Sequence, residues 1–331
     1  MAGTIGFDDM ESRYIKTYKL ITAAASVMLI LLIITAWTRE GIFSEWKKHQ
    51  KEYARMDTLS AEKFPVAIRQ LEFPDLGRTD RCVSCHTGIE NPGASLFEQP
   101  YRNHSGSFLD DHPPLKFGCT VCHGGQGRAL EKLQAHATGE SVYWPFPMLE
   151  HPYIQSSCGK CHLALFSDGA KMAGTDVFRD GQFIFNREGC LGCHKARGLG
   201  GTVGPDLTEQ GEKTKHEYSF QNIQGEQTVS NWLKEHFKDP EMVSPGSQML
   251  VTGLPEEEIE ALVTFTMGLA KPEIPFEYFS IETLRELKGG RGVLAGNLMF
   301  SFCCSACHGK EGGGKDYREY ETGVPSIGRQ G

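Results

Sequence analysis

Cys190-Leu-Gly-Cys193-His194 is the stretch that decides how this chain folds. The same Cys-x-x-Cys-His pattern occurs four more times, as Cys82-Val-Ser-Cys85-His86, Cys119-Thr-Val-Cys122-His123, Cys158-Gly-Lys-Cys161-His162 and Cys304-Ser-Ala-Cys307-His308. The five copies use ten of the 11 cysteines, and Cys303 is left over. The composition alone would give about 0.01 such pentamers in the chain, so the repeat is not accidental.

The spacing within each motif predicts covalent haem. Two thiols three positions apart lie on one side of a helical turn, where they can form thioethers to the two vinyl groups of one porphyrin. The histidine that follows then reaches the iron from the proximal side. We therefore predict five covalently attached c-type haems (heme c), with the ten motif cysteines as attachment points and the five motif histidines as iron ligands.

Three other readings of paired cysteines are weaker. Structural zinc uses Cys-x-x-Cys pairs but does not require a histidine after each second cysteine. A disulfide framework is typical of smaller secreted domains. A thioredoxin-like redox pair would occur once, not five times.

Composition excludes several classes of protein. The chain has 331 residues, 39% of them hydrophobic and 23% charged, which is unlike either a disordered tail or a polytopic membrane protein. Its formal net charge of −8 argues against a nucleic-acid partner.

One segment predicts a membrane anchor. Leu20 to Trp37 contains no charge and would rise about 27 Å as a helix, close to the hydrocarbon thickness of a bilayer. A cleaved signal peptide is the competing reading, but the run is long and no small-x-small site follows it. We expect a cytoplasmic N-terminus (residues 1–19) and a single span in lipid (20–38). Because thioether haem is attached outside the cytoplasm, residues from about 39 should lie on the periplasmic side of the inner (plasma) membrane.

The rest of the chain divides by composition. Residues 39–75 contain a predicted amphipathic helix and should form a stalk or linker. Residues 76–170 carry three motifs in a stretch rich in Gly, Pro and His, and we expect a compact trihaem module whose porphyrins supply the buried apolar surface. The predicted fold class is mainly α with much irregular loop.

Residues 171–275 follow a recognisable order. A helix from Phe178 runs to Gly189, the fourth motif follows, and Gly204-Pro205-Asp206-Leu207, a Pro-Gly-Ser-Gln-Met249 loop and a helix over 256–269 come after it. This order resembles class I cytochrome c. The resemblance implies that Met249 is the distal ligand opposite His194, with Met242 as its nearest competitor. It also implies that the Pro205 carbonyl accepts a hydrogen bond from His194, and that Gly181 lets the first helix approach the last near Phe265.

Residues 276–331 begin in the same way as a second such domain. The fifth motif is followed by a strap-like Gly323-Val324-Pro325, and the chain then ends without a methionine loop. We expect a partial class I domain here, with the sixth ligand of the fifth iron unassigned.

The three irons of the trihaem module need distal ligands. Spare histidines gather in this stretch, and we expect His104, His112 and His136 to serve, with His151 as a reserve. Spacing does not pair them with particular irons. His49, His216 and His236 are expected at the surface.

Irons with two axial ligands transfer electrons and do not bind substrate. The chain as a whole resembles the membrane-anchored cytochrome c subunit of a bc-like quinol oxidoreductase. That resemblance implies electron transfer from a quinol-oxidising, cytochrome b-containing membrane partner to a soluble or outer redox acceptor. Alternatives are a NapC/NrfH-like quinol dehydrogenase, a multihaem reductase with an open fifth haem, and a polymerising cytochrome.

Overall fold

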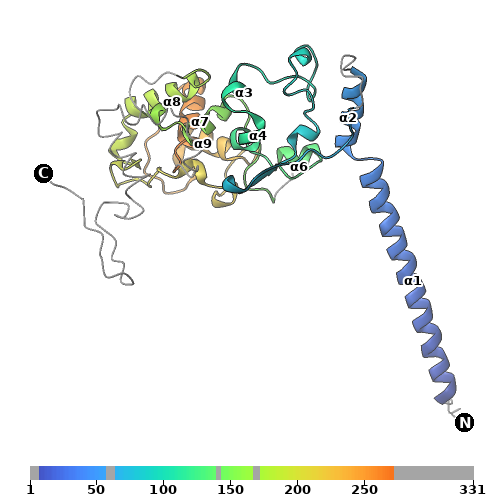
Figure 1. The fold of residues 1–331 in the computed structure, drawn as a ribbon. Helices are drawn as coiled ribbons and strands as arrows, with labels where there is room; N and C mark the ends of the chain where they lie inside the picture. Colours follow the sequence, from blue (N-terminus) through green and yellow to red (C-terminus); the bar gives the residue numbers. More distant parts are fainter. Residues whose placement is uncertain (1–6, 57–63, 139–142, 167–171, 272–331) are drawn as a thin grey trace, which may run out of the picture. The chain divides into compact units, whose positions relative to one another are not determined.

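The computed structural model describes residues 7–56, 64–138, 143–166 and 172–271 (Figure 1). This part of the chain is mostly helical with long irregular loops, as predicted. Its α-helices are α1 (Phe7–Gly41), α2 (Glu45–Met56), α3 (Phe108–Asp111), α4 (Pro114–Phe117), α5 (Thr120–His123), α6 (Lys132–His136), α7 (Ser156–Gly159), α8 (Asp176–Arg187), α9 (Val229–Lys238), α10 (Pro240–Val243) and α11 (Glu256–Met267). Strands β1 (Leu71–Phe73) and β2 (Arg78–Asp80) pair with each other, and β3 (Lys195–Ala196) pairs antiparallel with β4 (Leu199–Gly200).

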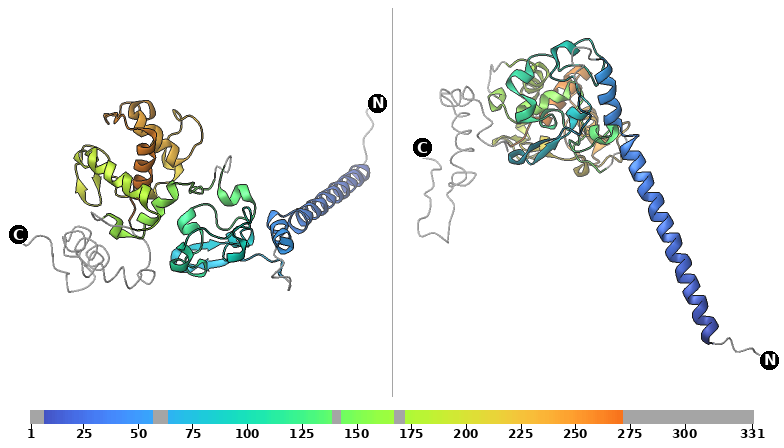
Figure 2. Two further views of the ribbon diagram at one scale, coloured as in Figure 1. Left: turned by 90° about the horizontal axis from the view of Figure 1, so that it is seen from above. Right: turned by 45° about the vertical axis from the view of Figure 1, so that its right-hand side comes forward.

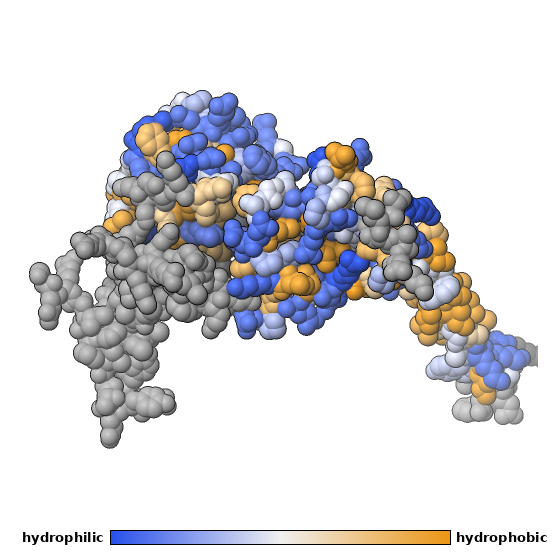
Figure 3. Space-filling view, turned by 45° about the horizontal axis from the view of Figure 1, so that its top comes forward, coloured by the Kyte–Doolittle hydropathy of each residue, from blue (hydrophilic) through white to orange (hydrophobic). Residues whose placement is uncertain are grey.

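Helix α1 contains the predicted span and extends beyond it. It has 35 residues, and its apolar side chains, such as Leu29 and Ile33, are more than half exposed. Hydrophobic residues cover much of the visible side of the helix in Figure 3. By length and composition α1 is able to cross a membrane, and an N-terminal signal sequence passes the same test.

The stalk helix α2 is a separate helix from α1. The sequence predicted that the stalk helix would begin at about residue 39. Residues 42–44 leave the helical path, and α2 starts at Glu45. Gly41, a poor helix former, is the last residue of α1, and the Ser44 hydroxyl donates to the Glu40 carbonyl at 3.0 Å. Ser44 is also buried. Its hydrogen bond therefore stabilises the bend between α1 and α2.

The contacts divide the chain into two compact units, which we describe separately. The first unit consists of residues 1–71, 80–113 and 128–135 and contains the first motif. The second consists of residues 72–79, 114–127 and 136–331, and the second, third and fourth motifs lie in it. The domain limits expected from composition stay predictions.

The core of the second unit lies where α8 crosses α11 (Figure 2). Phe178 on α8 and Leu262 on α11 are almost completely buried. Gly181 sits at the crossing: a Cβ built there would lie 1.9 Å from the Ala261 carbonyl oxygen and 2.7 Å from the Phe265 Cβ. The close approach implied by the resemblance is therefore confirmed, and it requires glycine at position 181.

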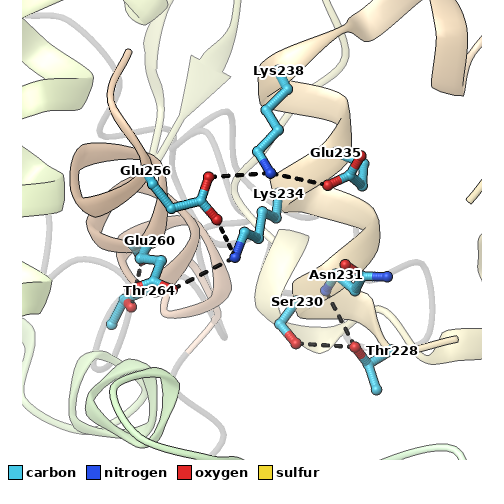
Figure 4. A network of polar contacts seen from close by, with 9 residues as sticks. All are labelled: Thr228, Ser230, Asn231, Lys234, Glu235, Lys238, Glu256, Glu260 and Thr264. Atoms are coloured by element: carbon cyan, nitrogen blue, oxygen red, sulfur yellow. Dashed lines mark hydrogen bonds and ion pairs between the residues drawn. The ribbon is translucent and has the colours of Figure 1, made fainter. Parts of the chain in front are cut away.

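A network of ion pairs fastens α9 to α11 (Figure 4). Lys234 pairs with Glu256 and lies 3.6 Å from Glu260, while Lys238 bridges Glu256 at 3.1 Å and Glu235 at 3.1 Å. Three glutamates in the first turn of α11 also suit the positive end of the helix dipole. The network holds the helix that leads toward Met249 against the closing helix.

Candidate haem sites

The fourth motif begins where α8 ends. Gly189 adopts the left-handed conformation (φ 68°) and turns the chain into the 3-10 turn Cys190–Gly192. The His194 N–H then donates to the Cys190 carbonyl at 2.9 Å. This single turn places both cysteines and the histidine within one tight loop.

The His194 ring is oriented by its own neighbours. Its Nδ1 lies 2.9 Å from the Pro205 carbonyl oxygen, and because a carbonyl only accepts, Nδ1 carries the proton. Nε2 is left with the lone pair that an iron ligand needs. Gly204 lies flat against the ring: a Cβ there would be 2.5 Å from Cε1 and 2.6 Å from Nδ1. The hydrogen bond that the resemblance implied for Pro205 is thus present.

Two further residues of the same unit bear on this site. Met249 is half-buried and packs against the core, and its N–H donates to the Ser247 hydroxyl at 3.3 Å. His236 is half-buried, contrary to the surface position expected for it, and its buried Nδ1 has no hydrogen-bond partner. Burial and then the charge of His194 lower the pKa of His236.

These residues fit a c-type haem. An orphaned imidazole nitrogen in the interior costs about 1–3 kcal/mol, which is tolerable where a cofactor shares the space. Cys190 and Cys193 would hold the porphyrin, and His194 would bind the iron. When bound, the haem supplies one-electron redox chemistry.

The motif cysteines in the described part of the chain are not paired in disulfides. All eight cysteines in the described part of the chain are free thiols. Burial raises the pKa of Cys161 to about 12 and that of Cys158 to about 11. A buried thiol with a raised pKa is a poor nucleophile at neutral pH, unlike the reactive cysteine of a thioredoxin-like pair, whose pKa is lowered.

The second and third motifs touch each other. The Ser157 hydroxyl, one residue before Cys158, donates to the Cys122 carbonyl at 2.7 Å. The third motif also touches the core of the second unit, since a Cβ on Gly159 would lie 2.9 Å from the Phe178 ring and 3.0 Å from the Gly268 carbonyl. Three of the motifs therefore share one compact unit.

His136 lies beside the second motif. One extended segment binds both: the Met148 N–H donates to the His136 carbonyl at 2.8 Å, and the Leu149 N–H donates to the His123 carbonyl at 2.7 Å. The Trp144 indole donates to the Gly125 carbonyl at 2.9 Å and closes the segment over the motif. Of the predicted distal ligands, His136 is the one whose backbone is tied to a motif in this unit.

The first motif is hydrogen-bonded to a residue that the sequence pattern did not single out. Gln50 on α2 is completely buried, and its amide donates to the Ser84 carbonyl at 2.9 Å and to the Ala67 carbonyl at 2.8 Å. His104 lies near this motif, because its N–H donates to the Ile89 carbonyl at 2.9 Å. A lone glutamine in a polar helix carries no sequence signal for such a role.

Of the two remaining predicted distal ligands, one lies at the end of a short helix and the other is exposed. His112 caps α3, with Nδ1 3.1 Å from the Phe108 carbonyl, and His151 is exposed. His49, expected at the surface, is half-buried and lies 2.9 Å from the Tyr101 hydroxyl. The fifth motif, with Cys304, Cys307 and His308, lies outside the described residues.

Comparison with known proteins bears on the fourth site. Residues 178–270 match the family model for cytochrome c. Cytochrome c oxidase subunit 2 of Bacillus subtilis is 30% identical over 104 residues, 29% of this chain and 28% of that protein. The same subunit of Alkalihalophilus pseudofirmus is 28% identical over 90 residues, 27% of this chain and 25% of that protein. This chain thus spans about a quarter of the length of these curated relatives, and no solved structure matches it.

The matched residues are those that form α8, the fourth motif, the Pro205 strap, the Met249 loop and α11. Over this stretch the sequence order, the geometry around His194 and the family model agree. Residues 178–270 therefore form a cytochrome c domain, which implies covalently bound haem c and supports a role of this domain in electron transfer.

Proposed function

We propose that this protein carries electrons through five covalently bound haems, from a quinol-oxidising membrane partner with a cytochrome b subunit to a soluble or outer acceptor. The observation that carries the proposal is the packing of three motifs in one unit. The second motif contacts the third through Ser157, and the third contacts the cytochrome c core through Gly159. Haems attached at such neighbouring points would be close enough for successive one-electron transfers.

The ligand sets give the chain a direction. Met/His ligation raises the potential of an iron above that of an iron with two imidazoles. With His104, His112 and His136 supplying imidazoles to the first three irons and Met249 serving the fourth, the fourth haem would have the higher potential. Electrons would then enter at the trihaem segment and leave from the cytochrome c domain or the fifth haem.

The location follows from α1 and from haem chemistry. With α1 as an uncleaved single-pass anchor in the inner membrane, all five haems would lie on the periplasmic side, beside a membrane donor. Both relatives are named as subunits of cytochrome c oxidase. That name supports placing the acceptor side of this chain within a respiratory chain as well.

Two experiments test the proposal on the full-length holoprotein. Purification from native membranes in mild detergent should retain a cytochrome b subunit in a fixed ratio, and a preparation that is active without any b-type haem would exclude this partner. Carbon monoxide difference spectra of the reduced protein should show almost no binding. Binding to one haem per chain would instead favour a multihaem reductase.

A further inference from the structure

We propose that Arg197 binds a carboxylate of covalently attached haem, namely a propionate of the haem at the third or the fourth motif. The inference rests on the proposed function, because the third motif carries haem only under that proposal. It deepens the proposed function by naming a residue that sets the potential of one haem. Arg197 and both motifs belong to the second unit.

Arg197 occupies an unfavourable place in the backbone. It is the first of the two residues that join β3 to β4, and its φ of 50° lies in the left-handed region. Gly198 follows it with a φ of 82°. Two-residue turns of this kind favour Asn, Asp or Gly at the first position. A long charged side chain held in this strained position suggests a role outside the turn itself.

The guanidinium of Arg197 is a partly buried cation without an anion. Its Nε is buried and has no hydrogen-bond partner. Burial is what lowers the pKa of Arg197, and no carboxylate of the described residues opposes that shift. Asp206 is engaged elsewhere: it accepts from the Thr208 hydroxyl, which in turn accepts from the Arg197 backbone N–H at 2.9 Å. Because an unpaired buried donor on a charged group is costly, the site requires an anion.

The guanidinium lies over an aromatic ring that follows the third motif. The Arg197 Cζ is 4.1 Å from the centroid of Phe166. Phe166 ends the 3-10 turn Leu163–Phe166, which begins directly after His162, and the Leu165 N–H donates to the His162 carbonyl at 3.0 Å. A guanidinium can cover an aromatic face and still present the N–H groups of its edge to a carboxylate. Arg197 therefore contacts the segment that carries the third axial histidine.

The same arginine is joined to the fourth motif. It follows His194 by three residues, and the strand after it folds back on the motif. The Gly201 N–H donates to the Leu191 carbonyl at 2.8 Å, and a Cβ on Gly200 would lie 2.1 Å from the His194 carbonyl oxygen. A covalently attached porphyrin cannot leave its motif, so its two propionates stay within the width of one ring. Arg197 is thus placed where carboxylates of these two haems are available.

A propionate fits this cation better than a free anion does. Arginine binds carboxylates through two parallel N–H···O bonds, and such a pair is stronger where water is partly excluded. A carboxylate tethered by thioether bonds also loses little freedom on binding. The positive charge stabilises the ferrous iron, which carries one positive charge less than the ferric iron. Arg197 should therefore raise the potential of the haem that it binds.

The test is a redox titration of the full-length holoprotein at neutral pH, with resonance Raman spectra of the same samples. Arg197→Asn removes the charge and suits the left-handed backbone, so this variant should fold. We expect the equilibrium constant for one-electron reduction of one haem to fall about tenfold, which corresponds to about 59 mV. The propionate bending band of that haem should shift as well. Arg197→Lys should restore most of the potential, because it restores the charge.

The control is Arg187→Gln, which removes an arginine that is already paired with Glu188 and Glu258. It should change the same constant less than twofold. The absorption band of the methionine-ligated haem identifies the source of the propionate. A shift in the titration followed at this band assigns the propionate to the fourth haem. A shift in another haem, with the midpoint at this band unchanged, assigns it to the third.

Two results would overturn the inference. One is an R197N protein whose potentials and propionate bands equal those of wild type while pyridine haemochrome still counts five haems; Arg197 would then be structural and the proposed function would stand. The other is an Asp168→Asn protein that reproduces the whole effect of R197N, because the anion would then be that side chain, which lies outside the described residues. A count of one haem would defeat the proposed function, and the titration of the fourth haem would still test Arg197.

Discussion

Replacing Gly181 by alanine sets two physical effects against each other. In the middle of a helix the change should stabilise by about 1 kcal/mol, because alanine has the higher helix propensity. At the crossing of α8 and α11 the new Cβ would lie 1.9 Å from the Ala261 oxygen, so the helices must separate by about 1.5 Å to restore ordinary contact. Overpacking of this kind costs about 3 kcal/mol. The net expectation is a loss of about 2 kcal/mol.

Thermal unfolding of the holoprotein measures this balance. For a domain of this size, a loss of 2 kcal/mol lowers the melting temperature by about 8–16 °C. The transition can be followed through the absorption band that a ferric haem shows when a methionine sulfur binds its iron. Asn186→Ala, on the exposed side of the same helix, is the control and should gain about half a kcal/mol. A G181A protein as stable as wild type or more stable would refute the packing described for α8 and α11.

Three other changes probe the fourth site and its frame. Gly204→Ala should push the His194 ring by about 0.9 Å and weaken its hydrogen bond, which raises the haem potential by about 40 mV, the equivalent of about 1 kcal/mol, in a redox titration. Met249→Ala should open the fourth iron, so that the reduced protein binds about one equivalent of carbon monoxide. Glu256→Gln should cost about 0.5 kcal/mol at neutral pH. Because Lys234 first of all lowers the pKa of Glu256 below its ordinary 4.5, the wild-type advantage in urea titrations should be full above pH 4.5 and disappear as the pH falls further.

Much of the cytochrome c domain could be predicted because its signals are local. Predicted helices at 178–189 and 256–269 correspond to α8 and α11 within two residues. The Pro205 and Gly181 contacts followed from the order of motifs that the chain shares with class I cytochrome c.

The contacts around the first motif could not be predicted, because they depend on tertiary packing. Gln50 is a polar residue in a strongly polar helix, yet it is fully buried against Ser84. His49 and His236 were predicted at the surface because their sequence neighbours are charged. Their partial burial depends on tertiary packing, which the sequence pattern does not show. The break at residues 42–44 was missed because Ile42 and Phe43 continue an apolar pattern while the backbone turns.

The central proposal is that five haems are bonded to this chain through ten sulfurs. The most direct measurement is the intact mass of purified, acetone-washed protein, combined with a pyridine haemochrome titration of the same sample. The account predicts a mass increase of five haems and five equivalents of c-type haem per chain. A single haem, confined to the cytochrome c domain, would contradict it.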